Sequence, residues 1–279
     1  MKKNIGIIGS GRLGHALASA LVQKTYPVAG INDKDLAKGK TIADKLGIDF
    51  YDNYKRLAEK SDILFLAVPD SIIIPAAKEI IASCKKPLVL LHPSGALSAY
   101  ALPEAENASR GSFHPLQSFV SENTVFKDIY ITMDGDEKAL EAAKALCRIL
   151  EARPLLVPAE DRALYHAAAC MASNYLVTLL SEVEDIFSLW ANTPKEARQA
   201  FWPLIKGTVD NFEKFGKPAL TGPIARGDIS TLKKHLAILP DKYESLYTVM
   251  AQYTAKLAFE QDMITEEKSD EIKSFLKGE

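Results

Sequence analysis

A glycine-rich turn near the amino terminus constrains the fold of this chain more than any other feature. Residues 9–14 read Gly-Ser-Gly-Arg-Leu-Gly, follow the apolar run Ile5–Ile8 and precede a helical pattern of apolar residues. Between a strand and a helix, Gly9 permits a tight turn, Gly11 leaves room for a pyrophosphate, and Gly14 lets the helix pack closely on the strand. The first N–H groups of such a helix point at the phosphates. The turn therefore predicts a dinucleotide site made by Gly9, Ser10, Gly11, Arg12, Leu13 and Gly14.

Strand and helix patterns alternate through the first half of the chain. Short apolar runs, typical of strands buried on both faces of a parallel sheet, occur at Asn4–Ile8, Val28–Asn32, Ile63–Val68, Leu88–Leu91, Ile129–Met133 and Leu155–Val157. Helical patterns fill the gaps at Leu13–Lys24, Asp35–Leu46, Ser71–Ser83 and Glu137–Glu151. This alternation predicts an α/β fold with a Rossmann-type doubly wound parallel sheet.

The second half reads as helical throughout. Apolar residues from Leu164 to Trp190 recur at spacings of three and four, which predicts one amphipathic helix of roughly 30 residues. Further helices are expected at Lys195–Phe215, Ser230–Leu239, Asp241–Gln261 and Glu266–Leu276, and no strand is expected beyond Val157. We therefore predict a dinucleotide-binding domain at 1–157 and an all-helical domain at 158–279 for substrate binding and dimerisation. The long helix fits a homodimer interface and the core of its own domain equally well.

Composition excludes several classes of partner. The chain has 279 residues and a formal net charge of −2, so it has no general attraction for nucleic acid or anionic membrane. We expect no membrane span, because no segment approaches about 18 uninterrupted apolar residues. Cys84, Cys147 and Cys170 lie far apart without metal-type spacing. They predict free thiols, no metal site and a cytoplasmic location.

The residues after the second predicted strand bear on the choice of cofactor. Asp33 lies 19 residues after Gly14, where an acidic residue would hold the ribose hydroxyls of NAD. Alternatively the strand ends at Asn32, Asp33 is a loop or cap residue, and lysines at 34, 38 and 40 meet the 2′-phosphate of NADP. The lysine cluster favours NADP, with NAD left open. Asn32, Asp33 and Lys34 are the candidate contacts in either case.

Polar groups gather where strands are predicted to end, which is where ligands bind in such folds. Val68-Pro69 follows one strand, His92-Pro93-Ser94 the next, and His114 a further extended segment. Val68, Pro69 and His92 are predicted to line the cofactor site, and Ser94 to orient the substrate. Either histidine alone reads as a turn residue before a proline. As a pair they favour a proton-transfer role for one of them.

The long helix carries a polar sector. His166, Cys170, Ser173 and Asn174 fall within about 100° of one another on a helical wheel. Such a sector lines a ligand cleft or makes a helix–helix contact, and the pattern does not separate the two. Further on, Thr221–Asp228 reads as a turn in which Asp228 caps the next helix. Arg226 either holds a substrate carboxylate or pairs with a surface acid.

Taken together, four segments resemble the signature of an uncharacterised bacterial family of Rossmann-like proteins named as NADP oxidoreductases. They are His92–Leu97, Ser112–Leu116, Tyr165–Asn174 and Gly222–Asp228. The family lies within the 6-phosphogluconate dehydrogenase-like superfamily, with prephenate dehydrogenase, pyrroline-5-carboxylate reductase and the 3-hydroxyacid dehydrogenases.

The resemblance implies roles for individual residues. His114-Pro115 resembles the His-Pro of prephenate dehydrogenases, in which that histidine accepts the proton of the substrate hydroxyl. Asn174 matches the asparagine of the hydroxyacid members, but Cys170 stands where they carry a proton-donating lysine. A thiol supplies no such cationic charge, so the role shifts to His166 or His114.

The resulting hypothesis is an NAD(P)-dependent oxidoreductase that acts on a small anionic metabolite. His114, His166 and Asn174 are its predicted catalytic residues, and Ser94, Ser173 and Arg226 its predicted substrate contacts. The alternative is a sensor or regulatory protein that binds NAD(P) without catalysis, a reading kept open by the missing lysine.

Overall fold

The chain folds into two compact units, Met1–Tyr175 and Leu176–Glu279. The structure, a computed structural model, describes residues 3–121 and 123–277. Within that range every strand lies in the first unit. The strands are β1 (Ile5–Ile8), β2 (Val28–Asn32), β3 (Ile63–Leu66), β4 (Leu88–His92), β5 (Ala108–Ser112), β6 (His114–Pro115), β7 (Tyr130–Met133) and β8 (Arg153–Leu156). The α-helices of this unit are α1 (Arg12–Gln23), α2 (Leu36–Leu46), α3 (Tyr54–Lys60), α4 (Asp70–Ser83), α5 (Glu137–Leu150) and α6 (Arg162–Cys170).

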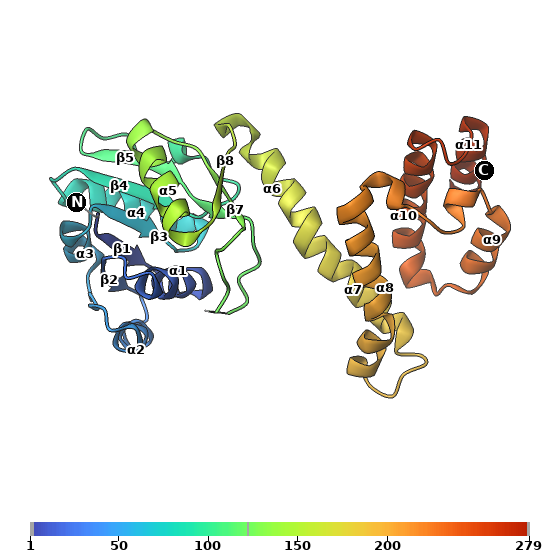
Figure 1. The fold of residues 1–279 in the computed structure, drawn as a ribbon, viewed down its shortest axis with the longest axis horizontal. Coiled ribbons are helices and arrows are strands. Elements are labelled where there is room, and N and C mark those ends of the chain that lie inside the picture. The colour runs from blue at the N-terminus through green and yellow to red at the C-terminus, as the bar shows by residue number, and fades with distance from the viewer. Residues whose placement is uncertain (1–2, 122, 278–279) are drawn as a thin grey trace. The chain divides into compact units, whose positions relative to one another are not determined.

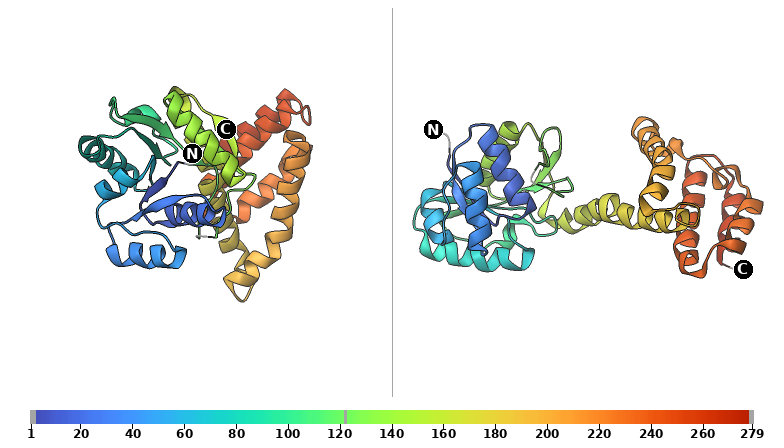
Figure 2. Two further views of the ribbon diagram at one scale, coloured as in Figure 1. Left: turned by 60° about the vertical axis from the view of Figure 1, so that its left-hand side comes forward. Right: turned by 90° about the horizontal axis from the view of Figure 1, so that it is seen from below.

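Five parallel strands in the order β2-β1-β3-β4-β5 form the central sheet, with helices on both of its faces (Figures 1 and 2). Alternate side chains of one strand enter different cores, as the period of two in a strand requires. Ile63 and Phe65 pack in the cluster that contains α1 and α5, whereas Leu64 and Leu66 pack with α3 and α4. This arrangement confirms the predicted doubly wound α/β fold.

A second, three-stranded sheet departs from the expectation of a single sheet. Its order is β6-β7-β8, with β6 antiparallel and β8 parallel to β7. The predicted strands at Ile129–Met133 and Leu155–Val157 therefore exist but leave the central sheet. The chain passes from β5 to β6 through Phe113 alone. This short passage places His114 where the two sheets diverge.

One α-helix and two strands were not among the predicted helices and strands, although a short extended segment was expected to end near His114. Helix α3 spans two turns and carries only a small apolar patch, Leu57 and Ala58, which is fully buried. Strand β5 reads Ala-Ser-Arg-Gly-Ser and lies at an edge of the sheet, so no apolar alternation marks it. Strand β6 has only two residues.

The predicted long helix is confirmed. Helix α6, a π-helical turn η3 (Met171–Tyr175) and α7 (Leu176–Phe187) form a continuous helical run within Ala159–Phe187. The compact units divide inside this run, later than the predicted boundary at 157/158, because α6 is anchored to the sheet unit by contacts described below. The division at 1–157 and 158–279 follows the change from strands to helices.

The second unit is helical, as the sequence predicts. Its α-helices are α7, α8 (Pro194–Phe215), α9 (Ile229–Ile238), α10 (Asp241–Glu260) and α11 (Glu266–Lys277). Short 3-10 turns, η4 (Lys217–Ala219) and η5 (Ile224–Arg226), join α8 to α9. Its core is small and gathers Leu232, Ala255 and Ile272 from α9, α10 and α11.

The helix Ala159–Phe187 is long and apolar enough, by length and composition alone, to cross a membrane. Its most apolar 18-residue window has a mean hydropathy of 1.2, and none of that window is buried in the chain. The expectation concerned uninterrupted apolar residues, whereas this helix meets a criterion of length and mean hydropathy over a window that includes polar residues. Length and composition do not distinguish a span from a helix that packs against protein.

Candidate functional site

The glycine turn has the geometry that a phosphate site needs. Gly9 has a φ of +97°, and a Cβ at this position would overlap the carbonyl oxygen of Ala67. A Cβ on Gly14 would overlap the carbonyl oxygen of Gly9. Gly11, by contrast, faces open space, with no atom within 4 Å of an added Cβ. Helix α1 starts there without a side-chain cap, so its first N–H groups remain available to an anion.

Asp33 and Ser10 tie this turn to the end of β2. The Asp33 carboxylate accepts hydrogen bonds from the Ser10 backbone N–H (2.6 Å) and the Ser10 hydroxyl (2.5 Å). Its other oxygen accepts the Asp35 N–H at 2.9 Å. Burial raises the pKa of Asp33, but the hydrogen bonds from Ser10 and Asp35 outweigh burial and hold that pKa below its usual value. Both carboxylate oxygens are therefore engaged within the protein.

The other predicted cofactor contacts fall into exposed and buried groups. Arg12 and Lys34 are exposed, and Lys38 and Lys40 are exposed on α2. Asn32 is buried and donates from Nδ2 to the carbonyl oxygen of Tyr51 at 2.8 Å. The exposed cations suit a 2′-phosphate better than the occupied Asp33 suits free ribose hydroxyls.

The ends of β3 and β4 are joined by a hydrogen bond. Ser94 donates from Oγ to Asp70 Oδ2 at 2.6 Å and accepts the Leu97 N–H at 3.1 Å. Ser94 is 4% exposed and holds the turn after β4 together. This placement does not fit its predicted contact with substrate. Val68 and Pro69 follow β3; Val68 is partly exposed and Pro69 is exposed.

His92 is fully buried at the end of β4. Its Nε2 lies 3.2 Å from the carbonyl oxygen of Ser98. Burial lowers its pKa to about 4, so the ring is neutral at pH 7. A side chain with no exposed surface does not contact a cofactor, and His92 is better explained as a packing residue.

His114 lies beside the first turns of α6. Its Nδ1 is 2.6 Å from the hydroxyl of Tyr165, and its ring packs edge-on against the ring of His166 with centroids 5.8 Å apart. Burial, then the positive charge of Arg162, lowers the pKa of His114 to about 4. Gly95 makes this packing possible, because a Cβ there would overlap Nδ1 of His166.

Arg162 was missed by the sequence analysis, and it anchors α6 to the sheet unit. It is 1% exposed, donates to the carbonyl oxygen of Ser94 at 2.7 Å, and lies 3.7 Å from Asp134 Oδ1. Asp134 in turn accepts hydrogen bonds from Ser112 and from the Ala99 N–H. A signal was present, because Arg162 is one turn before His166 on the same polar sector of the helix.

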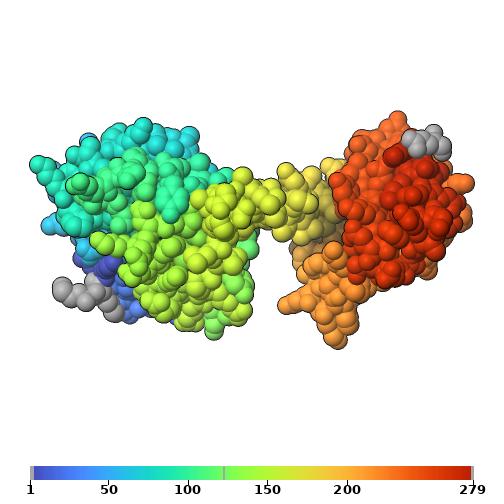
Figure 3. Space-filling model, turned by 90° about the horizontal axis from the view of Figure 1, so that it is seen from above, coloured from blue at the N-terminus to red at the C-terminus, as the bar shows by residue number. Residues whose placement is uncertain are grey.

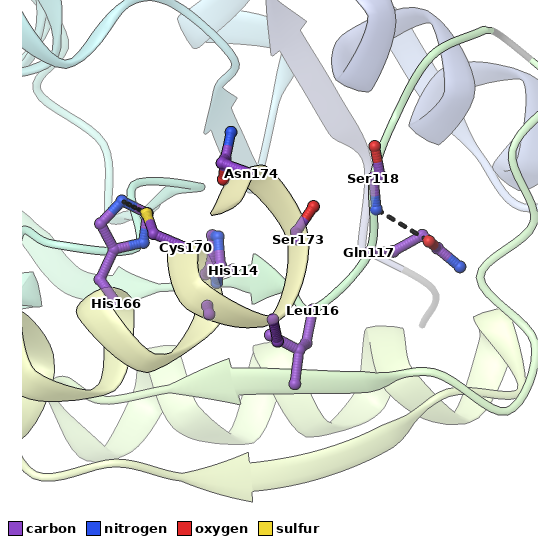
Figure 4. A pocket seen from close by; sticks show the side chains of 10 residues that line it. His114, Leu116, Gln117, Ser118, His166, Cys170, Ser173 and Asn174 are labelled. Atoms are coloured by element: carbon purple, nitrogen blue, oxygen red, sulfur yellow. Dashed lines mark hydrogen bonds between the residues drawn. The ribbon is translucent and has the colours of Figure 1, made fainter. Parts of the chain in front are cut away.

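A cavity of about 340 Å³ opens beside these histidines (Figure 4). It contains all four residues of the predicted polar sector of the helix, namely His166, Cys170, Ser173 and Asn174, together with His114, Leu116, Gln117, Ser118, Ala169 and Ala172. Ser173 and Asn174 belong to the π-helical turn η3. Such turns are frequent at functional sites. The sector therefore lines a cavity, and its volume is in the range of small-molecule sites.

Arg226 and Asp228 lie in the second unit. Asp228 caps α9 by accepting the Thr231 N–H at 3.1 Å, as predicted. Hydrogen bonds from Thr231 and Ser230 lower its pKa to about 2. Arg226 is exposed in η5. Its contact with substrate stays a prediction. No cluster of three or more potential metal-ligating side chains occurs among the residues described.

Two family comparisons cover most of the chain. Residues 4–91 match the family described as NADP oxidoreductase, coenzyme F420-dependent. Residues 129–254 match a domain of unknown function, DUF2520. Both matches lie in the same chain, one in its amino-terminal part and the other in its carboxy-terminal part. This combination confirms the family resemblance drawn from the four sequence segments. The matched part of the NADP oxidoreductase domain contains the glycine turn, Asp33 and the end of β3.

Individual relatives agree with this assignment. Pyrroline-5-carboxylate reductase of Escherichia coli (strain K12) is 30% identical over 89 residues, which are 31% of this chain and 33% of that protein. The chain thus matches about a third of the length of its curated relatives.

Solved structures share the fold along nearly the whole chain. A candidate NADP oxidoreductase from Bacteroides fragilis has a TM-score of 0.74 and 21% identity, covering 92% of this chain and 96% of its own. Pyrroline carboxylate reductase from Plasmodium falciparum, solved with NADP bound, has a TM-score of 0.64 and 17% identity, covering 98% of this chain and 100% of its own. At these identities the likeness establishes the fold.

Proposed function

We propose that this chain transfers hydride between NADP and a small metabolite with a carbonyl, imine or hydroxyl group. The observation that carries the proposal is the open glycine turn at an uncapped helix start, in the same compact unit as a polar cavity with two histidines. Gly9, Gly11 and Gly14 would cradle the pyrophosphate, and Arg12 and Lys34 would meet the 2′-phosphate. When bound, the nicotinamide supplies or accepts the hydride.

The residues of the cavity would transfer the proton and orient the substrate. His114 is neutral at pH 7, because its pKa is about 4, and its Nδ1 is engaged by Tyr165. A neutral imidazole can accept the proton of a substrate hydroxyl. His166 lies next to it on the cavity wall, as the second candidate for this role. Ser173 and Asn174 would orient the substrate by hydrogen bonds.

The proposal also covers the charge of the substrate, the oligomeric state of the protein and its location in the cell. Among the described residues that line the cavity there is neither lysine nor arginine, so the cavity wall itself offers no cation to an anionic substrate. We propose a homodimer through the helical part, because Leu164, Met171 and Val177 are 74%, 64% and 67% exposed. In Figure 3 the yellow stretch that contains α6 lies at the visible surface. Three free thiols suit the cytoplasm.

Two measurements test the function. NADPH and NADH fluorescence titrations should show NADPH binding at least about tenfold tighter, and Lys34→Ala should reduce that preference. NADPH oxidation should then occur with a member of a panel of 2-oxo acids and cyclic imines. Cofactor binding without turnover of any panel member would contradict the proposed reaction.

A non-catalytic NADP sensor is the second candidate. The observation that favours it is that the described residues lining the cavity include Cys170 but no lysine. In the hydroxyacid dehydrogenases that the sequence resembles, a proton-donating lysine stands at the position of Cys170. His114→Ala separates the two functions. A sensor would keep its NADPH affinity and lose nothing else, whereas an enzyme would keep the affinity and lose about 10²-fold or more in kcat.

A further inference from the structure

The three cysteines of this chain occupy different environments. Cys84 and Cys147 are 3% and 0% exposed and pack in the two cores of the sheet unit. Burial raises the pKa of the Cys147 thiol to about 12. Cys170 is partly exposed and lines the cavity. The cavity therefore presents a thiol to small molecules, whereas the two core thiols are shielded.

A histidine lies within hydrogen-bond reach of this thiol. The Sγ atom of Cys170 is 3.7 Å from Nε2 of His166, one helical turn earlier (Figure 4). The His166 ring is held in place by the edge-on ring of His114 and by its close approach to Gly95. A thiol with a positioned imidazole is the arrangement of an activated nucleophile.

We propose that Cys170 and His166 capture a small aldehyde as a reversible thiohemiacetal. The Sγ–carbon bond forms while the carbon–oxygen π bond breaks. The thiol proton passes by way of His166 Nε2 to the carbonyl oxygen, and nothing is oxidised or reduced. This inference rests on the proposed function and names its substrate class, because the captured carbon keeps the hydrogen that hydride transfer would remove.

The cavity wall favours an aldehyde over other carbonyl chemistry. The described residues that line it include no lysine, so none of them offers an amine for capture as an imine. The hydroxyl and amide groups of Ser118, Ser173 and Asn174 can hydrogen-bond the carbonyl oxygen and the adduct hydroxyl. A volume of about 340 Å³ admits a small metabolite.

The test follows alkylation of individual cysteines by iodoacetamide, using peptide mass mapping of the native protein. Cys170 should react, and Cys84 and Cys147 should serve as unreactive internal controls. His166→Gln should slow the reaction of Cys170 by about tenfold or more. The matched control is His235→Gln, which removes a histidine that contacts Tyr247 on the helical unit and should leave the rate unchanged. Thermal melting of each variant checks that it is folded.

Aldehydes are then tested as protecting agents. Neutral and carboxylate-bearing short aldehydes at millimolar concentration should slow Cys170 alkylation several-fold, and the corresponding alcohols should not. Equal protection by aldehyde and alcohol would overturn the proposal, as would a His166→Gln rate equal to wild type. NADPH fluorescence on the same samples tests the cofactor separately. Aldehyde protection without NADPH binding would overturn the proposed function and leave the capture intact.

Discussion

Apolar side chains are buried in the parallel sheet but exposed on the long helix that follows it. Ile5, Phe65 and Leu91 of the sheet have no exposed surface, whereas Leu164 and Val177 of the helix are 74% and 67% exposed. The sheet is covered on both faces by helices of its own chain. The helix exposes a surface that soluble monomers rarely leave open. The first region thus buries its apolar side chains within one chain, whereas the second leaves many of its own exposed.

The largest expected effect concerns the anchor between these regions. Arg162→Met should destabilise the protein by about 3–5 kcal/mol, because it leaves the buried carboxylate of Asp134 without its cation. Urea unfolding measures the change. Arg153→Met is the control, since Arg153 pairs with Asp128 at the surface and the loss of this exposed pair should change stability little. Equal losses in the two variants would show that Arg162 is not an anchor.

The second-largest effect is expected for substitutions in the glycine turn of the sheet unit. Gly9→Ala should cost about 3 kcal/mol, since the new Cβ meets the Ala67 carbonyl at a φ of +97°. Gly11→Ala enters open space, so it should change stability by well under about 1 kcal/mol. It should nevertheless weaken NADPH binding, because the methyl group occupies the approach of the pyrophosphate. Thermal melts and NADPH titrations distinguish the two, and unchanged binding in Gly11→Ala would contradict the phosphate site.

Buried histidines make the stability of the sheet unit depend on pH. Burial lowers the pKa of His92 and of His114 to about 4, below the usual value of 6.5. Between pH 4 and 6.5 the unfolded chain therefore binds more protons than the folded one. Stability is fully present above pH 6.5 and falls as the pH drops toward 4, by up to about 1.4 kcal/mol per pH unit for each histidine.

His114→Gln should remove one histidine's share of this slope. Urea unfolding at several pH values between 4 and 7 measures it, with His235→Gln on the helical unit as the control. A slope that is the same in His114→Gln and wild type would show that His114 does not titrate in this way.

The smallest expected effect tests whether the long helix has a partner. If Leu164 is covered by a second copy, Leu164→Ser should weaken dimerisation by about 1–2 kcal/mol per buried side chain. Light scattering coupled to gel filtration, over a concentration series, measures the equilibrium. Lys206→Ser on α8, a surface change that breaks only an exposed ion pair with Asp210, is the control. A wild-type protein that is monomeric at every concentration would show that no second copy covers the apolar side chains of the long helix.

Most of the helices and strands could be predicted from local patterns of residues. The glycine turn and the buried apolar strands specify the doubly wound fold, because each demands one local geometry. The period of the long helix also placed His166, Cys170, Ser173 and Asn174 on one sector, and the structure puts all four on the cavity wall. The polar edge strand β5 and the short helix α3 were not predicted as such, because neither contains enough apolar residues to show a periodic pattern.

Contacts between distant parts of the chain determined the remaining features of the site. The sequence by itself determined that a phosphate could approach Gly11, because backbone geometry in that turn is set by neighbouring residues. Only the tertiary structure showed that the Asp33 carboxylate is occupied by Ser10, that His92 is buried, and that Arg162 joins α6 to the sheet. It also brought His114 to Tyr165 and His166, from segments about 50 residues apart. Burial and charge at each side chain are sums over distant parts of the chain, and no local pattern contains them.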